Sequence, residues 1–335
     1  GTINCFIRRP NHLTGDYLYY IHKPEDISIK YGIPPVKTLA LETSVLPYDQ
    51  ITRLTKAFNP TVITNGSDIM RHARAVKTPY ELGLIRESGI RQAHVYSQVP
   101  HIYREGMTDL ELQVELERLS RLEGCLGLFR ISGNSMELYM ANILVGDNAD
   151  TPTPYDFAMG GEGLDPSIPV GCNGSIIHAG ESVMVDANGN YTGYMTDMTR
   201  TFAIGGTLSD TAMKAHRCSI DICHALAREG KPGKAAKELY GLAEEIATDA
   251  GLHEYFMGHR QKAGFVGHGV GIEINELPVI APRSRDILTE GNVIALEPKF
   301  VIPGVGAVGI ENTYHVTTDG LIPLTIMPED IISLT

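Results

Sequence analysis

The sequence has no long apolar run and a shortage of basic residues, and each absence narrows the possible functions. It contains no stretch of about 18 apolar residues that would predict a transmembrane helix. It also contains no charged segment followed by an apolar one, the pattern that is typical of a secretory leader. There are 28 Lys and Arg against 40 Asp and Glu, a formal net charge of -12. This acidity argues against nucleic acid or an anionic membrane as a partner.

Cysteine is also scarce. The five cysteines are odd in number and scattered, and no two form a CxxC pair: Cys5, Cys125, Cys172, Cys218 and Cys223. This pattern predicts buried, unpaired thiols in a reducing compartment, and we expect a cytoplasmic protein. The chain begins with Gly-Thr and not with Met, which leaves open that a leader has been removed from it.

The remaining composition is that of a globular protein with a large core. A length of 335 residues with 43% hydrophobic residues suits one large domain and a smaller one. Residues 1–70 mix short strand-like runs with one helical segment, 48–58, and predict a partial α/β domain. Thr78, Pro79 and Glu81 then form a capping box, which starts a helix. We place the domain boundary just before it, so that residues 71–335 form the second domain.

The second domain shows the same order of elements twice. Helices are predicted over 78–103 and from a second capping box at Thr108, and strands follow a long loop-rich excursion over 124–180. Helices are predicted again over 209–228 and 234–250, followed by strands over 292–300 and 307–317. The two halves share no obvious residue identity, so the repeat is one of architecture only.

An apolar hairpin over 181–202 carries two carboxylates. Val183 to Val185 lead into Asp186, Asn188-Gly189 has the chemistry of a turn, and the return strand carries Asp197. An unpaired buried carboxylate costs roughly several kcal/mol, so the two acids would have raised pKa values, attract a cation or bind a metal. Arg200 is the only cation near them in sequence. The hairpin alone does not decide between paired, solvated and metal-binding acids.

Three further residues interrupt apolar or glycine-rich segments downstream. His268 lies between two glycines, and Glu297 and Glu311 each break an apolar run. Together with the hairpin acids they supply four carboxylates and one imidazole, a set suited to two divalent ions such as Mn, Co, Zn or Fe. Four negative charges balance two such ions, which would make a bridging water acidic enough to be hydroxide near neutral pH.

These residues lie in segments that resemble the pita-bread dinuclear metallopeptidases, the family of methionine aminopeptidase, Xaa-Pro aminopeptidase and Xaa-Pro dipeptidase (prolidase). The similar segments are VMVDANGNYTGYMTDMTRTF, FVGHGVGIEINELP, ALEPKF and GIENTYHVTTDG, and RAVKTPYELGLIR resembles the join between domains in the prolidase branch. The resemblance covers about residues 71–330. It implies an α+β pita-bread domain, a peptide substrate and a homodimer.

The resemblance also implies roles for single residues. Asp197 and Glu311 would bridge both metals, Asp186 would complete one site, and His268 with Glu297 would complete the other. The hydroxide between the metals would attack a peptide carbonyl. Glu297, or a carboxylate beside it, would carry the proton to the leaving amine.

Several departures from the family pattern bear on substrate choice and rate. Relatives carry a histidine in a segment before the hairpin. The nearest counterparts here are 148–156 and 165–171, and neither contains histidine. Asn275-Glu276 stands where relatives have His-Glu, and Gly309 where they have Arg. Asn275 could still donate a hydrogen bond to a substrate carbonyl, and His178 is a candidate to replace the missing histidine. The N-terminal part is shorter than in such relatives, which predicts a truncated domain.

Three functions follow in order of preference. The first is a metal-dependent aminopeptidase or dipeptidase, with a preference for Xaa-Pro bonds that rests on the resemblance alone. The second is a non-peptidase enzyme, such as a lyase, on the same metal scaffold. The third is a catalytically silent binding protein, which the intact ligand set and the acidic charge argue against.

Overall fold

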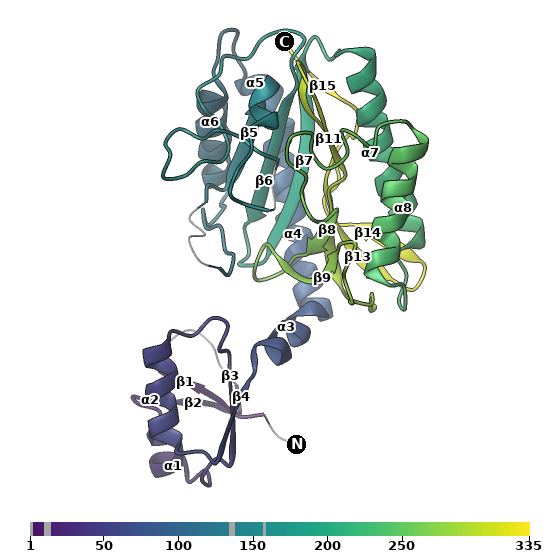
Figure 1. The fold of residues 1–335 in the computed structure, drawn as a ribbon. Helices are drawn as coiled ribbons and strands as arrows, with labels where there is room; N and C mark the ends of the chain where they lie inside the picture. The colour runs from purple at the N-terminus through teal and green to yellow at the C-terminus, as the bar shows by residue number, and fades with distance from the viewer. Residues whose placement is uncertain (1–2, 10–14, 134–137, 157–158) are drawn as a thin grey trace. The chain divides into compact units, whose positions relative to one another are not determined.

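The computed structural model describes residues 3–9, 15–133, 138–156 and 159–335. The chain divides into two compact units, Gly1–Ala73 and Arg74–Thr335. Helix α3 (Ser67–Ala75) contains the point of division. Each unit has its own secondary structure (Figure 1).

The first unit combines short strands with two helices. Its parallel strand pairs are β1 (Cys5–Ile7) with β2 (Leu18–Tyr20) and β3 (Thr38–Leu41) with β4 (Val62–Asn65). Its helices are α1 (Asp26–Tyr31) and α2 (Tyr48–Phe58), and α2 has the bounds that the sequence predicts. The mixture is that of a small α/β unit.

The first half of the second unit packs helices on an antiparallel hairpin. The helices are α4 (Pro79–Ser97), α5 (Val99–Ile102) and α6 (Asp109–Leu122). Capping boxes at Thr78 and Thr108 start α4 and α6, as predicted. The sheet has the order β15-β7-β6-β5, from Ile332–Leu334, Met195–Ile204, Val183–Asn190 and Ala141–Val145, and a 3-10 helix, Gly146–Asp150, follows β5.

The second half repeats this plan with other residues. Its helices are α7 (Asp210–Glu229) and α8 (Ala236–Asp249). The larger sheet has the order β14-β13-β10-β8-β9, from Gly320–Pro323, Asn312–Thr317, Val293–Leu296, Gly267–Gly269 and Glu276–Ile280. A smaller antiparallel pair joins β11 (Lys299–Ile302) to β12 (Gly306–Gly309).

The strands of the two halves meet between two groups of helices. Figure 1 shows α5 and α6 on one side of the strands and α7 and α8 on the other. One apolar core lies mainly under α7 and α8, and another lies under α4 to α6. A bridge of two backbone hydrogen bonds between Thr199 and Glu311 links strand β7 of the first half to the second half. Two expected ligands, Asp197 and Glu311, are therefore fixed to one another through the backbone.

Two details of the predicted strands are wrong. Asn188 and Gly189 do not form the hairpin turn, because they pair in the ladder with Asp197 and Thr196. The turn lies at residues 191–194, where Gly193 has a φ of 89°. Gly189 serves close packing instead, since a Cβ there would lie 2.5 Å from the Thr196 hydroxyl oxygen.

The segments 292–300 and 307–317 are also not single strands. Each is divided between two sheets, and the acid lies at the division: Glu297 between β10 and β11, and Glu311 between β12 and β13. Both acids therefore lie outside the regular strands, and both line the same pocket.

Within the described ranges, no helix combines the length and the apolar character needed to cross a bilayer.

Candidate metal centre

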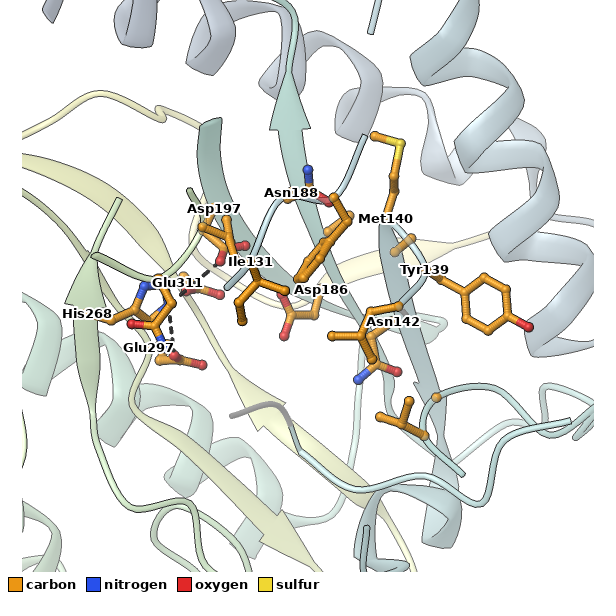
Figure 2. Close-up of a pocket in the computed structure, with 18 of the residues that line it drawn as sticks. Ile131, Tyr139, Met140, Asn142, Asp186, Asn188, Asp197, His268, Glu297 and Glu311 are labelled. Carbon is orange, nitrogen blue, oxygen red and sulfur yellow. Dashed lines mark ion pairs between the residues drawn. The ribbon is translucent and has the colours of Figure 1, made fainter. Parts of the chain in front are cut away.

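Five side chains predicted from the sequence converge on one pocket in the second unit (Figure 2). They come from both halves: Asp186 in β6, Asp197 in β7, His268 in β8, and Glu297 and Glu311 in the links between strands. Asp186 and Asp197 share a face of the hairpin, because Asp197 pairs with Asn188, two residues after Asp186. His268 lies beside Ala295, two residues before Glu297.

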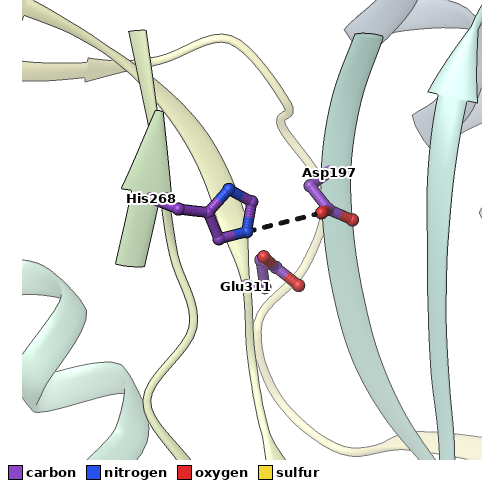
Figure 3. Close-up of side chains that lie close together, drawn as sticks. All are labelled: Asp197, His268 and Glu311. Atoms are coloured by element: carbon purple, nitrogen blue, oxygen red, sulfur yellow. Dashed lines mark ion pairs between the residues drawn. The ribbon is translucent and has the colours of Figure 1, made fainter. Parts of the chain in front are cut away.

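The cluster is buried and its polar atoms lie close together. Asp197, His268, Glu297 and Glu311 are between 1% and 9% exposed. The His268 Nε2 lies 3.4 Å from Glu297 Oε1 and 3.8 Å from Asp197 Oδ2, the second pair being marked in Figure 3. The backbone N–H of Asp197 donates to the Thr313 hydroxyl, which in turn donates to the Asp197 carbonyl oxygen, and these two bonds hold strand β7 against β13.

The hydrogen bonding of His268 suits a metal ligand. Its Nδ1 lies 3.1 Å from the carbonyl oxygen of Gly269, which can only accept, so Nδ1 donates. In the neutral ring this leaves the lone pair on Nε2, the atom that faces the acids. Burial alone would lower the pKa of His268, but the hydrogen bond and charge of Glu297 raise it overall in the metal-free protein.

Lys299 also belongs to this cluster, although it was not among the site residues predicted from the sequence. Its side chain is fully buried, and its Nζ lies 2.8 Å from Asp186 Oδ2, 2.7 Å from Glu297 Oε2 and 3.3 Å from Glu311 Oε2. A signal was present in the sequence, because Lys299 opens the otherwise apolar strand KFVI two residues after Glu297. A lysine in a fully buried strand needs an anionic partner.

The ammonium group does not balance all the acids. Burial, and then the neighbouring charges of Glu311 and Asp186, raise the pKa of Asp197 well above its usual range. Burial is also the main reason that the pKa of Glu311 rises to about 8. Burial alone would raise the pKa of Glu297 as well, but the charge of Lys299 and the hydrogen bond from His268 lower it. Raised carboxyl pKa values indicate that the single ammonium does not neutralise the acids, so that a further cation would be stabilised there.

Arg200, the nearest cation in sequence, serves another purpose. Its fully buried guanidinium donates to backbone carbonyls of Thr199, Glu311, Met327 and Pro328 and to the side chain of Asn312. It therefore ties the link carrying Glu311 to the end of the chain, and Lys299 is the cation that contacts the site carboxylates.

The other residues singled out from the sequence have different outcomes. Asn275 lines the pocket and is exposed. His178 is exposed and is not among the pocket residues, and its backbone N–H donates to the Glu181 carboxylate 3.3 Å away. It is therefore in no position to replace a pocket histidine. At Gly309 a Cβ would lie 2.7 Å from the Pro298 carbonyl oxygen, so the backbone leaves no room for a side chain.

The pocket beside the acids is largely apolar. Its walls include the side chains of Phe129, Ile131, Tyr139, Met140 and Phe265. Asn188 also lines it, and both its amide nitrogen and its amide oxygen are buried without a hydrogen-bond partner. Figure 2 shows Asn188 beside Asp186 and Asp197. A buried amide of this kind is available to a bound ligand.

The donor set fits a divalent cation at one position. Single ligand atoms of Asp197, His268 and Glu311 lie within 4.8 Å of one another (Figure 3). Glu311 Oε1 is buried and has no hydrogen-bond partner, as expected for an atom that awaits a cation. Single ligand atoms of a second group, Asp186, Glu297 and Glu311, also lie within 4.8 Å of one another. The Lys299 ammonium contacts all three members of that second group.

A buried centre of four acids and one histidine between the two halves of an α+β unit is typical of metal-dependent hydrolases. Comparison with known proteins agrees with this class. The profile of metallopeptidase family M24 matches residues 83–318. The chain belongs to metallopeptidase family M24, and the α+β pita-bread fold predicted from the sequence is confirmed.

Individual relatives are similar to most of the chain. The Xaa-Pro dipeptidase of Pyrococcus horikoshii is 28% identical over 298 residues, which cover 89% of this chain and 75% of that protein. The Xaa-Pro dipeptidase of Lactobacillus delbrueckii subsp. lactis is 30% identical over 259 residues, covering 77% of this chain and 62% of that protein.

Solved structures support the same fold. The prolidase of Pyrococcus horikoshii superimposes with a TM-score of 0.74 at 25% identity, covering 94% of this chain and 81% of that one. The X-Pro aminopeptidase of Thermotoga maritima superimposes with a TM-score of 0.77 at 22% identity, covering 95% and 82%, and shows the fold alone.

Proposed function

We propose that this protein is a metal-dependent dipeptidase or aminopeptidase with a preference for Xaa-Pro bonds, in which Asp197, His268 and Glu311 bind a divalent ion. The observation that carries the proposal is the convergence of the five predicted side chains on one pocket of an M24 fold. The names of the similar Xaa-Pro dipeptidases support the choice of bond. Carboxylate and imidazole ligands suit Mn, Co, Zn or Fe.

A divalent ion, when bound, polarises a peptide carbonyl and activates water as a nucleophile. Glu297 is the proposed proton carrier. Its Oε1 faces His268 and its lowered pKa keeps it ionised at neutral pH, so Oε1 can accept a proton and pass it to the leaving amine. The other oxygen of Glu297, Oε2, contacts the Lys299 ammonium group, which also contacts Asp186.

The pocket walls account for substrate binding. The apolar side chains of Phe129, Ile131 and Phe265 suit a proline ring or another apolar side chain. The unpartnered amide of Asn188 and the side chain of Asn275 supply hydrogen bonds for the substrate backbone. Because neither asparagine can shuttle a proton, their proposed role is in binding and orientation.

The test is cleavage of a peptide panel by the full chain loaded with Mn or Co. The panel contains Xaa-Pro dipeptides, longer Xaa-Pro peptides and the matched Xaa-Ala peptides. We expect the fastest cleavage of Xaa-Pro peptides and none by the Glu297→Gln variant. Metal content is measured on the same samples. A metal-loaded protein that cleaves none of the peptides would rule out the peptidase and favour the lyase or the silent binding protein.

We propose further that the protein is a cytoplasmic homodimer that binds neither nucleic acid nor membranes. All five cysteines are free thiols and four of them are buried, which supports a reducing compartment. The acidic charge supports the absence of polyanionic partners. The proposal of a dimer rests on the resemblance to the prolidase branch. Light scattering on the protein as it elutes from a size-exclusion column distinguishes one chain from two.

A further inference from the structure

We propose that Lys299 permanently fills one of the two cation positions of the centre, so that the protein binds a single divalent ion through Asp197, His268 and Glu311. The inference rests on the proposed metal-dependent function and concerns the number of ions, where the sequence alone predicts two. It is carried by the position of one buried side chain.

The ammonium group is fully matched where it lies. An ammonium has three donors and no acceptor, and Lys299 Nζ has three carboxylate partners at 2.7–3.3 Å. The distances to Asp186 and Glu297, 2.8 and 2.7 Å, are ordinary for charge-assisted hydrogen bonds, and the contact with Glu311 at 3.3 Å is longer. The nitrogen therefore has no lone pair to offer a metal, and it contacts every carboxylate that a second ion would use.

The Lys299 ammonium has no route to solvent. The side chain of this lysine is 0% exposed, and the residue begins strand β11, whose residues are all buried. A second ion among Asp186, Glu297 and Glu311 would have to displace the ammonium into the core, where it would be an unpaired buried charge. If the ammonium stayed, two cations would share the same three acids without any group between them.

The first position is open in the same structure. Glu311 divides its two oxygens: Oε2 accepts from Lys299 and from the Thr199 hydroxyl, and Oε1 has no partner. Asp197 is not among the carboxylates that Lys299 contacts. One divalent ion and one ammonium thus divide the acids between them, and Glu311 serves both.

The first measurement is the metal content of the protein of residues 1–335 after loading with excess Mn and removal of free ion. We expect one ion per chain by elemental analysis. We also expect the electron paramagnetic resonance spectrum of an isolated Mn ion. Two ions per chain, or the spectrum of an exchange-coupled pair, would overturn the inference.

The second measurement changes the lysine. Lys299→Met removes the charge while keeping the length of the side chain, and we expect the metal content to rise from one ion to two. Lys299→Arg retains a cation and should bind one. Lys77→Met is the matched control, because Lys77 is also buried and pairs with Glu276, and neither residue lines the pocket. It should bind one ion. A folded Lys299→Met protein that still binds one ion would refute the role of the lysine.

A third variant keeps the inference testable if Lys299→Met does not fold. Asp186 contacts the ammonium and is not a ligand of the single ion, so Asp186→Asn should retain one ion with its affinity nearly unchanged. A loss of metal from Asp186→Asn would contradict the inference. One bound ion without peptide cleavage would support this inference and refute the peptidase, whereas no bound ion in any variant would refute both.

Discussion

At the scale of single residues, the sequence points to the acids and the histidine, but it does not show which acids the buried Lys299 contacts. Asp186 and Asp197 could be found because they interrupt apolar strands, and Glu297 and Glu311 for the same reason. Lys299 lies 113 residues from Asp186, and its contacts depend on where β11 falls after the link at Pro298. No local pattern determines that placement, so its role could be read only from the assembled fold.

Asp197 should contribute strongly to metal affinity. Asp197→Ala removes a ligand of the proposed ion, and we expect its metal affinity to fall by more than the roughly 10–100-fold that follows loss of an outer-shell partner. Asp221→Ala, at an exposed position of α7, is the control and should bind metal like the parent. Isothermal titration with Mn measures both. An Asp197 variant with parental affinity would remove this residue from the ligand set.

The cysteines provide a residue-scale test of the core. Burial raises the pKa of Cys172 to about 12 and that of Cys218 to about 11, so neither thiol is ionised in the folded protein at mildly alkaline pH. Cys5 is exposed. We expect iodoacetamide to label Cys5 in the native protein and all five cysteines after unfolding, as peptide mass spectrometry can show. Rapid native labelling of Cys218 would mean that α7 is less well packed than described.

At the scale of elements, helix starts were predictable and strand ends were not. The capping boxes at Thr78 and Thr108 predict the first residues of α4 and α6 because the signal is local. The hairpin turn was misplaced because Asn188-Gly189 has the composition of a turn, whereas the register of β6 and β7 is set by packing. Tertiary contacts decide which of several polar positions forms the turn.

Helix α4 contains two glycines whose replacement should have opposite effects. A Cβ at Gly83 has open space, so Gly83→Ala should stabilise the protein by roughly 0.5–1 kcal/mol through helix propensity. A Cβ at Gly89 would lie 2.2 Å from the carbonyl oxygen of Leu324, so Gly89→Ala should destabilise it by about 1–3 kcal/mol. Urea unfolding midpoints give both values. Equal effects of the two substitutions would contradict the close packing of α4 on the segment at Leu324.

At the scale of the whole molecule, the repeated order of elements predicted a centre between two halves. What the sequence could not supply was the join, because the Thr199–Glu311 bridge pairs residues 112 positions apart. The apolar cores draw residues from both halves, and the acids lie where the strands of the two halves meet. The site is thus a product of the assembled unit, and neither half alone holds the complete set of ligands.

The second unit should be sufficient for metal binding. All five predicted site residues and Lys299 lie within Arg74–Thr335, as do the ion pairs of Arg74 with Glu273 and of Lys77 with Glu276. We expect a protein of residues 74–335 to fold and to bind as many metal ions as the full chain. Circular dichroism and elemental analysis test this. A soluble, folded fragment without metal would show that the first unit contributes to the centre.

The ammonium of Lys299 also bears on the protein without its metal. Stripping both ions from a cluster of acids leaves mutual repulsion, but here one positive charge is part of the polypeptide and no chelator can extract it. Three of the carboxylates keep their partner in the empty protein, so EDTA should abolish activity while lowering the melting temperature only slightly. The metal-free protein should therefore stay folded and regain its activity when the ion is added again.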